Sequence, residues 1–204
     1  MSGARPDRPV DPGRLEHPVL VELLVELLVE RGASAIEHPG GTLLDHLGRV
    51  ATLLERWGAP DDVQLAGLCH ACYGTDGFPA SLLDLDERDV LAGWIGPRAE
   101  AWVYLYASCD RGAVYPELCA PGPLRFRDRF TGKTSLVPEL DAAVLAELTA
   151  ANELDIVTVN PAWGADVGPG VLELLRGVRP RLSESAWDAW DAWAAVTLTQ
   201  SDGA

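Results

Sequence analysis

The chain has 204 residues, of which 48% are hydrophobic and 23% charged, as expected for a globular protein large enough to form one domain. Its formal net charge of −15 argues against nucleic acid or an anionic membrane as a partner. There is no apolar run of the roughly 20 residues that a membrane-spanning helix needs, and residues 1–14 lack the apolar stretch of a signal peptide. We therefore expect a cytoplasmic protein with a flexible N-terminal tail (1–16) and a single domain (17–204).

Helical periodicity dominates the first half of the chain. Apolar residues recur every three or four positions in 18–31, 42–57 and 62–71, and glycine and proline turns separate these segments. Thr42 is followed three residues later by Asp45, which is close to a capping box at a helix start. Two further helices are predicted over 84–90 and 97–109.

The pattern changes between 113 and 138, where three prolines exclude a long helix. Apolar residues here alternate with Arg125, Arg127 and Arg129, which predicts a short strand or hairpin that turns at Thr131 and Gly132. Helices resume over 139–155, over 170–176 and after 183. On the last of them, three tryptophans share one face and are expected to seal the core: Trp187, Trp190 and Trp193. The sequence thus predicts an all-α fold, a helical bundle with a short β-hairpin insertion.

Histidine is scarce, with only four residues in the chain: His17, His38, His46 and His70. His46 and His70 lie in two consecutive apolar helices. A buried imidazole is costly unless it contacts a hydrogen-bond partner or a metal ion. We therefore expect these two side chains to face each other across adjacent helices.

Two segments around these histidines resemble the HD-domain superfamily. The run TLLDHLGRVA (42–51) resembles its first-histidine helix, and LAGLCHA (65–71) resembles its second. The similarity covers roughly residues 36–155. Within the superfamily, the segments are most similar to alarmone (ppGpp) hydrolases, and also to an uncharacterised family of small HD-like proteins with a His-Ala or His-Ser pair followed by Tyr-Gly-Thr.

This resemblance implies a metal site. In the superfamily, a histidine, a His-Asp pair and a later aspartate bind one or two divalent ions. Ala71 stands here where the paired aspartate is expected, so the resemblance implies a single ion held by His46, His70 and one carboxylate. Such a set suits Fe(II), Mn(II) or Zn(II). Asp110 is favoured as the carboxylate because Asp110-Arg111 repeats an Asp-Arg step of the alarmone hydrolases, and Asp155 is the alternative.

Other residues are candidates for substrate binding or proton transfer. We expect His38 and Asn152 to line the site, and Arg111 to lie beside it. Tyr73, Thr75 and Asp76 follow His70 directly and are candidate catalytic groups.

The basic cluster in the predicted hairpin offers a second set of candidates. Arg125 and Arg127, with Arg129 and Lys133, could clamp an anionic substrate, or could simply protect an edge strand from aggregation.

The four cysteines (Cys69, Cys72, Cys109 and Cys119) are interpreted as small buried side chains rather than zinc ligands or disulfides.

Three functions remain open at this point. The leading hypothesis is a metal-dependent hydrolase of a small phosphorylated or nucleotide-like metabolite. The second is a non-haem iron oxygenase or lyase acting on a small metabolite, and the third is a metal-free HD-like fold that binds a ligand or partner without turnover. The oligomeric state stays open.

Overall fold

The computed structural model describes residues 16–197, and within them the chain is almost entirely helical. Its α-helices are α1 (His17–Glu30), α2 (Leu43–Arg56), α3 (Asp61–Cys69), α4 (Arg88–Ile95), α5 (Pro97–Ser108), α6 (Arg111–Leu118), α7 (Glu139–Val159), α8 (Pro161–Val178) and α9 (Glu184–Thr197). Short 3-10 turns occur at Ala33–Ala35, Leu85–Glu87 and Arg179–Arg181. The expected all-α class is confirmed.

Two small antiparallel sheets complete the described part of the chain. Strands β1 (Glu37–His38) and β2 (Gly41–Thr42) form a minimal hairpin just before α2. Strands β3 (Leu124–Arg127) and β4 (Thr134–Val137) pair with Leu124 opposite Val137, and this is the hairpin insertion that the alternating pattern predicts.

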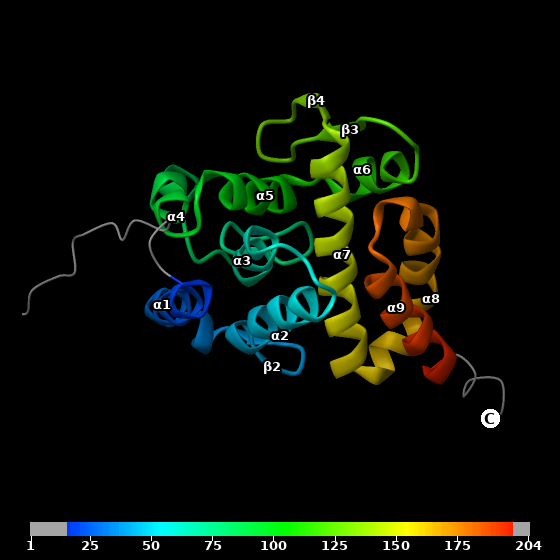
Figure 1. The fold of residues 1–204 in the computed structure, drawn as a ribbon, viewed down its shortest axis with the longest axis horizontal. Coiled ribbons are helices and arrows are strands. Elements are labelled where there is room, and N and C mark those ends of the chain that lie inside the picture. The colour runs from blue at the N-terminus through cyan, green and yellow to red at the C-terminus, as the bar shows by residue number, and fades with distance from the viewer. Residues whose placement is uncertain (1–15, 198–204) are drawn as a thin grey trace, which may run out of the picture.

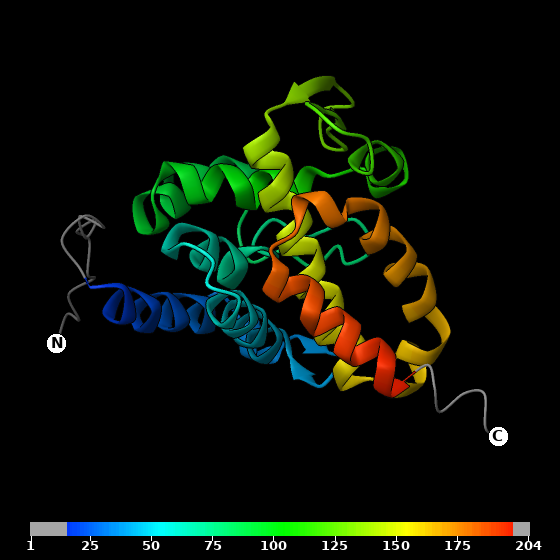
Figure 2. The same ribbon diagram turned by 45° about the vertical axis from the view of Figure 1, so that its right-hand side comes forward.

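Helix α7 is the central element of the molecule. Figure 1 shows it standing between a stack of α2, α3 and α5 on one side and the pair α8 and α9 on the other. Figure 2 shows α8 and α9 crossing in front of α7 while the β3–β4 hairpin sits at its N-terminal end. Because α7 is covered on both sides, most of its residues from Ala142 to Val157 are buried, including several polar ones. Its buried polar residues are therefore placed to form a site inside the bundle.

The C-terminal helices close the core with tryptophan, as expected. Trp190 is fully buried, and its indole N–H donates to the carbonyl of Ala150 in α7 at 3.0 Å. Trp187 and Trp193 are partly buried and pack against the same core.

Two helices differ from the sequence prediction because proline is tolerated inside them. α8 begins at Pro161, well before the expected 170, and continues through Pro169; α6 contains Pro116. A side chain caps the start of each helix: Asn160 accepts a hydrogen bond from Trp163 N–H in α8, and Asp110 accepts one from Ala113 N–H in α6. Proline removes one intrahelical hydrogen bond. Here tertiary packing compensates, with Leu172 and Leu175 of α8 buried in the core.

The expected tail (1–16) falls outside the described residues except for Glu16. Between residues 16 and 197, none of the helices combines the length and the apolar character required to traverse a bilayer.

Candidate functional site

His46 is held on the buried face of α2. The helix begins with a complete capping box, in which the Thr42 hydroxyl accepts from Asp45 N–H and the Asp45 carboxylate accepts from Thr42 N–H. This fixes the helix start one turn before the histidine. His46 is 1% exposed and lies between Leu43 and Leu47 on the face that packs into the core.

His70 lies at the C-terminal end of α3, the helix that packs against α2. The two helices approach closely at Gly67, where an added Cβ would lie 2.2 Å from a methyl carbon of Leu54. The Nδ1 atom of His70 is 2.7 Å from the Gly67 carbonyl oxygen, which can only accept a hydrogen bond. Nδ1 of His70 is therefore protonated, and in the neutral ring Nε2 carries the lone pair.

The two imidazoles face each other as predicted, with 3.3 Å between their Nε2 atoms. Asn152 of α7 brings its side-chain oxygen to 3.1 Å from the same Nε2 of His46. Two nitrogens bound to one ion at about 2.1 Å with a tetrahedral angle would be about 3.4 Å apart. The observed separation therefore suits a shared ion, and equally a shared proton.

Asp155 contacts the opposite edge of the His46 ring. Its carboxylate lies 2.7 Å from Nδ1 of His46 and also accepts from Arg49, at 2.6 Å from Nε and 3.0 Å from Nη2. Asp155 is 4% exposed. Burial by itself raises the pKa of Asp155, but the hydrogen bonds from His46 and Arg49 outweigh it and hold the pKa below its usual value. The ionised carboxylate orients the ring so that Nε2 points toward His70.

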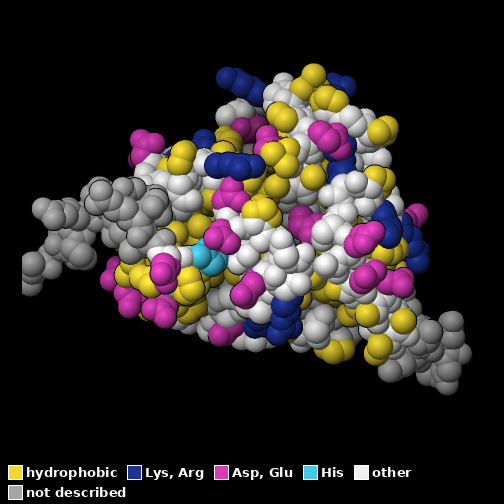
Figure 3. All heavy atoms as spheres, in the orientation of Figure 1, with side chains coloured by type: hydrophobic (Ala, Val, Ile, Leu, Met, Phe, Trp, Pro, Cys, Tyr) yellow, Lys and Arg dark blue, Asp and Glu magenta, His cyan; other side chains and the backbone are white. Residues whose placement is uncertain are grey.

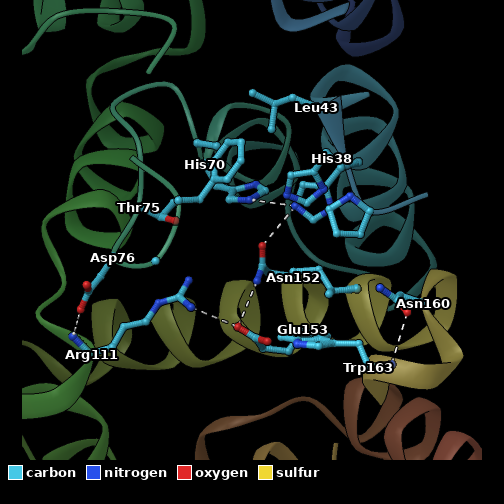
Figure 4. Close-up of a pocket in the computed structure, with 16 residues that line it drawn as sticks. His38, Leu43, His70, Thr75, Asp76, Arg111, Asn152, Glu153, Asn160 and Trp163 are labelled. Atoms are coloured by element: carbon cyan, nitrogen blue, oxygen red, sulfur yellow. Dashed lines mark hydrogen bonds and ion pairs between the residues drawn. The ribbon is translucent and has the colours of Figure 1, made fainter. Parts of the chain in front are cut away.

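A cavity of about 330 Å³ opens beside the imidazole pair. Figure 4 shows side chains from four parts of the chain converging on it: His38 before α2, His70 after α3, Arg111 of α6, and Asn152 and Glu153 of α7. Thr75, Asp76, Phe78 and Trp163 also line the cavity. The pocket therefore combines a polar floor with partly aromatic walls.

Arg111 and Glu153 form the charged part of the floor. Arg111 Nη1 lies 3.3 Å from Glu153 Oε1, which also accepts from the Asn152 amide at 3.1 Å. Burial raises the pKa of Glu153, although Arg111 opposes the shift. Asp76 contributes by accepting the Arg111 backbone N–H at 2.9 Å, so it positions the start of α6.

His38 stacks on His46 with 4.1 Å between ring centroids. Its Nδ1 atom is buried and has no hydrogen-bond partner among the described residues. Burial, and then the neighbouring His46, lower the pKa of His38 to about 4. The expectation that His38 lines the mouth of the site agrees with this position.

The structure corrects the choice of Asp110 as third ligand. Asp110 is the N-cap of α6, where it accepts from Ala113 N–H at 3.2 Å and lies 3.2 Å from Nε of Arg127. It does not line the cavity. The aspartate that reaches the imidazole pair is Asp155, and it contacts Nδ1 rather than the shared Nε2 side.

Tyr73 and the hairpin arginines also lie away from the cavity. The Tyr73 hydroxyl donates to Glu100 at 3.0 Å, on the side of α3 that faces α4 and α5. Arg125 is exposed, and Arg127 pairs with Asp110, because strand alternation directs both away from the core. Arg129 is held by the Ala107 carbonyl. Of the basic residues proposed for substrate binding, the structure brings Arg111 to the site.

The cysteines are free within the described residues, and three of them are buried as expected. Cys119 is exposed, which corrects the expectation for that residue.

Few groups at the imidazole pair are of the kind that binds a metal ion. Across residues 16–197, three or more His, Cys, Asp or Glu side chains nowhere gather in an arrangement able to hold a metal. The possible ligands at the imidazole pair are the two Nε2 atoms and the Asn152 side-chain oxygen, and Ala71 is buried nearby.

Glu153 and Trp163 are site residues that sequence reasoning missed. A face shared by Asn152, Asp155 and Ile156 on one helix is the signal that would have pointed to this turn of α7.

Comparison with known families gives one match. A family model described as "Domain of unknown function (DUF6817)" matches residues 27–111. These residues include both members of the imidazole pair and Arg111, whereas Asn152, Glu153 and Asp155 lie beyond the match. Searches among curated proteins and among solved structures give no match.

Proposed function

We propose that this chain is a metal-dependent hydrolase of a small phosphorylated or nucleotide-like metabolite, with a helical core related to the HD superfamily. The observation that carries the proposal is the convergence of the His46 and His70 Nε2 atoms at 3.3 Å in a buried place that opens onto a cavity.

The hydrogen bonds of the two rings favour a cation between them. Nδ1 of His70 faces a carbonyl oxygen and Nδ1 of His46 faces a carboxylate, so both Nδ1 atoms carry protons. In the neutral rings, both Nε2 lone pairs then point toward the same place. Burial, and then the neighbouring His46, lower the pKa of His70 to about 3, so this ring does not supply the positive charge itself. A divalent ion bound between His46, His70 and Asn152 would accept a lone pair from each of the two Nε2 atoms and from the Asn152 side-chain oxygen.

The chain's own residues then have distinct roles. A bound ion would polarise a phosphoryl oxygen and lower the pKa of a bound water. Glu153, whose pKa burial raises, is suited to accept a proton from that water. Arg111 keeps its charge and lines the cavity beside Glu153, where its guanidinium can pair with an anionic group of the substrate. Asp155 and Arg49 hold His46 in place from behind.

Two alternatives have different support. An oxygenase or lyase with two histidines and one carboxylate needs a carboxylate on the ion, and Asp155 instead binds Nδ1 of His46. A metal-free ligand-binding role is favoured by one observation, the lack of a carboxylate among the donors at the pair. In that case a proton on Nε2 of His46 would bridge the two rings.

Metal analysis tests the proposal directly. The purified chain is loaded separately with Mn(II), Fe(II) or Zn(II), and bound metal and thermal stability are measured. We expect about one ion per chain, and a stabilisation of about 2.7 kcal/mol at a free ion concentration 100 times the dissociation constant. His46→Ala should abolish both effects, whereas His17→Ala should not, because His17 contacts Gln64 on α3 outside the cavity.

Turnover is measured next, as phosphate release from a panel of nucleotides and sugar phosphates. Glu153→Gln should keep the ion but lose about 100-fold or more in rate, the usual contribution of a general base. If neither the parent chain nor His46→Ala binds any of the three ions, the hydrolase proposal is wrong and the metal-free binding role remains.

A further inference from the structure

The charged side chains around the site cavity are few and almost balanced. Among the described residues that line it, Arg111 is the single cation, whereas Asp76 and Glu153 carry carboxylates. With histidine neutral at pH 7, one guanidinium and two carboxylates sum to −1, and to zero when Glu153 holds a proton. In neither state is the lining positive, so its side chains do not by themselves attract an anion.

The guanidinium of Arg111 already has partners of its own. Nη1 lies 3.3 Å from Glu153 Oε1, and Nη2 donates to the Tyr106 hydroxyl at 3.1 Å. The guanidinium carbon also stands 5.8 Å from the centre of the Tyr106 ring. A guanidinium has more N–H donors than these contacts use. Arg111 can therefore make one contact with an anionic group, but it does not belong to a cluster of cations that would hold several.

The helix starts beside the cavity are also occupied. Free N–H groups at the start of a helix often bind phosphate. Here the Asp76 carboxylate accepts Arg111 N–H of α6 at 2.9 Å, and the Asn160 side chain accepts Trp163 N–H of α8 at 3.3 Å (Figure 4). These two first-turn N–H groups are taken by the chain's own side chains. The cap on α6 is itself an acid that lines the cavity, so a ligand there meets the Asp76 charge.

The charge of a phosphoryl group in this cavity would therefore be balanced mainly by an ion at the imidazole pair. A divalent ion matches one phosphomonoester, which carries about −1.5 to −2 at pH 7. Each further phosphoryl group adds negative charge that nothing in the lining offsets. The whole molecule increases this repulsion: its net charge is −15, and Figure 3 shows acidic side chains scattered over the face, with Lys and Arg in small separate groups.

The rest of the lining is mainly apolar. Several parts of the chain contribute to it: Pro39, Leu43, Ala71, Phe78, Ile156 and Trp163. The Phe78 ring stands edge-on to that of His38, with 5.1 Å between centroids. The volume of about 330 Å³ is near the lower end of ligand pockets. Such walls suit a compact group with an apolar, flat surface.

We infer that this cavity selects a phosphomonoester of a compact, uncharged, largely apolar group, and that Asp76 is a specificity-determining residue that disfavours ligands with two or more phosphoryl groups. The inference rests on the proposed function, because the ion at the imidazole pair balances the single phosphoryl group. The selectivity is an equilibrium property of the cavity, so it is measured without turnover.

Titration calorimetry of the full chain at a buffered free Mn(II) concentration tests the selectivity, with phosphonates as probes because their C–P bond resists hydrolysis. The first pair is 4-tert-butylphenylphosphonate and 1,4-phenylenebisphosphonate, which are similar in size and differ in charge. We expect the bisphosphonate to bind about tenfold more weakly, because its second anionic group meets carboxylates and no cation. The second pair has equal charge: phenylphosphonate should bind about tenfold more tightly than 2-hydroxyethylphosphonate, because its ring buries apolar surface.

Asp76→Asn tests the specificity residue. The amide oxygen can still accept Arg111 N–H, so the start of α6 is kept while the charge is removed. The bisphosphonate should gain about threefold or more in affinity relative to the monophosphonate. Asp86→Asn is the matched control, because Asp86 is exposed and does not line the cavity, and it should leave the ratio unchanged.

Equal affinity for the two members of either pair, an unchanged ratio in Asp76→Asn, or no binding of phenylphosphonate would overturn the inference. Phosphate release separates it from the proposed function. A chain that shows these affinities but releases phosphate from no ester would refute the hydrolase and leave the ligand class in place. A chain that hydrolyses ATP faster than AMP would support the hydrolase and refute the selectivity.

Discussion

The lowered pKa of the buried His70 ring is the residue-scale feature with the clearest consequence for folding stability. The ring is 2% exposed, and burial, followed by the neighbouring His46, lowers its pKa from 6.5 to about 3. At pH values between about 6.5 and 3, the unfolded chain therefore binds a proton on His70 that the folded chain does not. Folding stability must fall as the pH decreases through this window.

We expect the metal-free protein to lose about 1.4 kcal/mol of unfolding free energy per pH unit from this single group below pH 6. Urea unfolding at closely spaced pH values between 7 and 5, with a chelator present, measures the slope. His70→Gln removes the titration and should flatten the curve by that amount, even if it lowers stability throughout. Parallel curves for the two proteins would show that His70 does not stay neutral in the fold.

Single residues differ in how far the sequence reveals them. The imidazole pair could be predicted because a histidine within an apolar helix needs a partner, and two such helices in succession pack together. The role of Asp155 could not be predicted. Which edge of the His46 ring the carboxylate approaches depends on how α7 is rotated about its own axis. Asp110 was the wrong choice for a related reason: an aspartate at a helix start is as readily a cap as a ligand.

At the scale of elements, the corner between α7 and α8 positions one wall of the pocket. Gly164 lies in the first turn of α8, and a Cβ there would lie 2.6 Å from the Val157 carbonyl oxygen of α7. The neighbouring Trp163 lines the cavity. The close approach of two helix backbones thus depends on the absence of a side chain at this position.

Gly164→Ala should destabilise the protein by about 1–3 kcal/mol, because the backbone oxygen cannot yield as a side chain would. Gly170→Ala is the matched control in the same helix, where an added Cβ meets nothing within 4 Å and alanine should gain up to about 1 kcal/mol from helix propensity. Thermal unfolding should therefore shift in opposite directions, by about 2–4 °C per kcal/mol for a chain of this size. A Gly164→Ala protein as stable as Gly170→Ala would contradict the close-packed corner.

Most elements followed from the sequence, and two of the misses share one cause. The helix predicted over 84–90 is instead a 3-10 turn at Leu85–Glu87 followed by α4 at Arg88–Ile95, and the short β1–β2 hairpin was not predicted. Periodicity predicted α1, α2, α3, α5, α7, α9 and the hairpin, because their apolar faces are regular. Pro116 and Pro169 concealed the extent of α6 and α8, since proline weakens a helix locally. The packing of α6 against β3 and α8, and of α8 against α7 and α9, depends on residues far away in sequence.

The whole molecule brings the site together from two regions of sequence. The family match covers 27–111, which contains His46, His70 and Arg111. Asn152, Glu153 and Asp155 come from α7, which packs against α2, α3 and α5 and carries a nearly continuous buried surface. Without α7, the apolar faces of α2 and α5 would be open to water and His46 would lose the carboxylate that orients it.

The segment 27–111 should therefore fail to fold cooperatively when expressed alone. We expect a broad, non-sigmoidal thermal transition by circular dichroism and strong binding of a hydrophobic dye, since a large apolar surface stays exposed. Adding the separately expressed segment 112–204 should restore a cooperative transition, because it supplies α7 and its cover of α8 and α9. A sharp transition for 27–111 alone, with little dye binding, would mean that the matched segment is an independent unit and that α7 joins a site already formed.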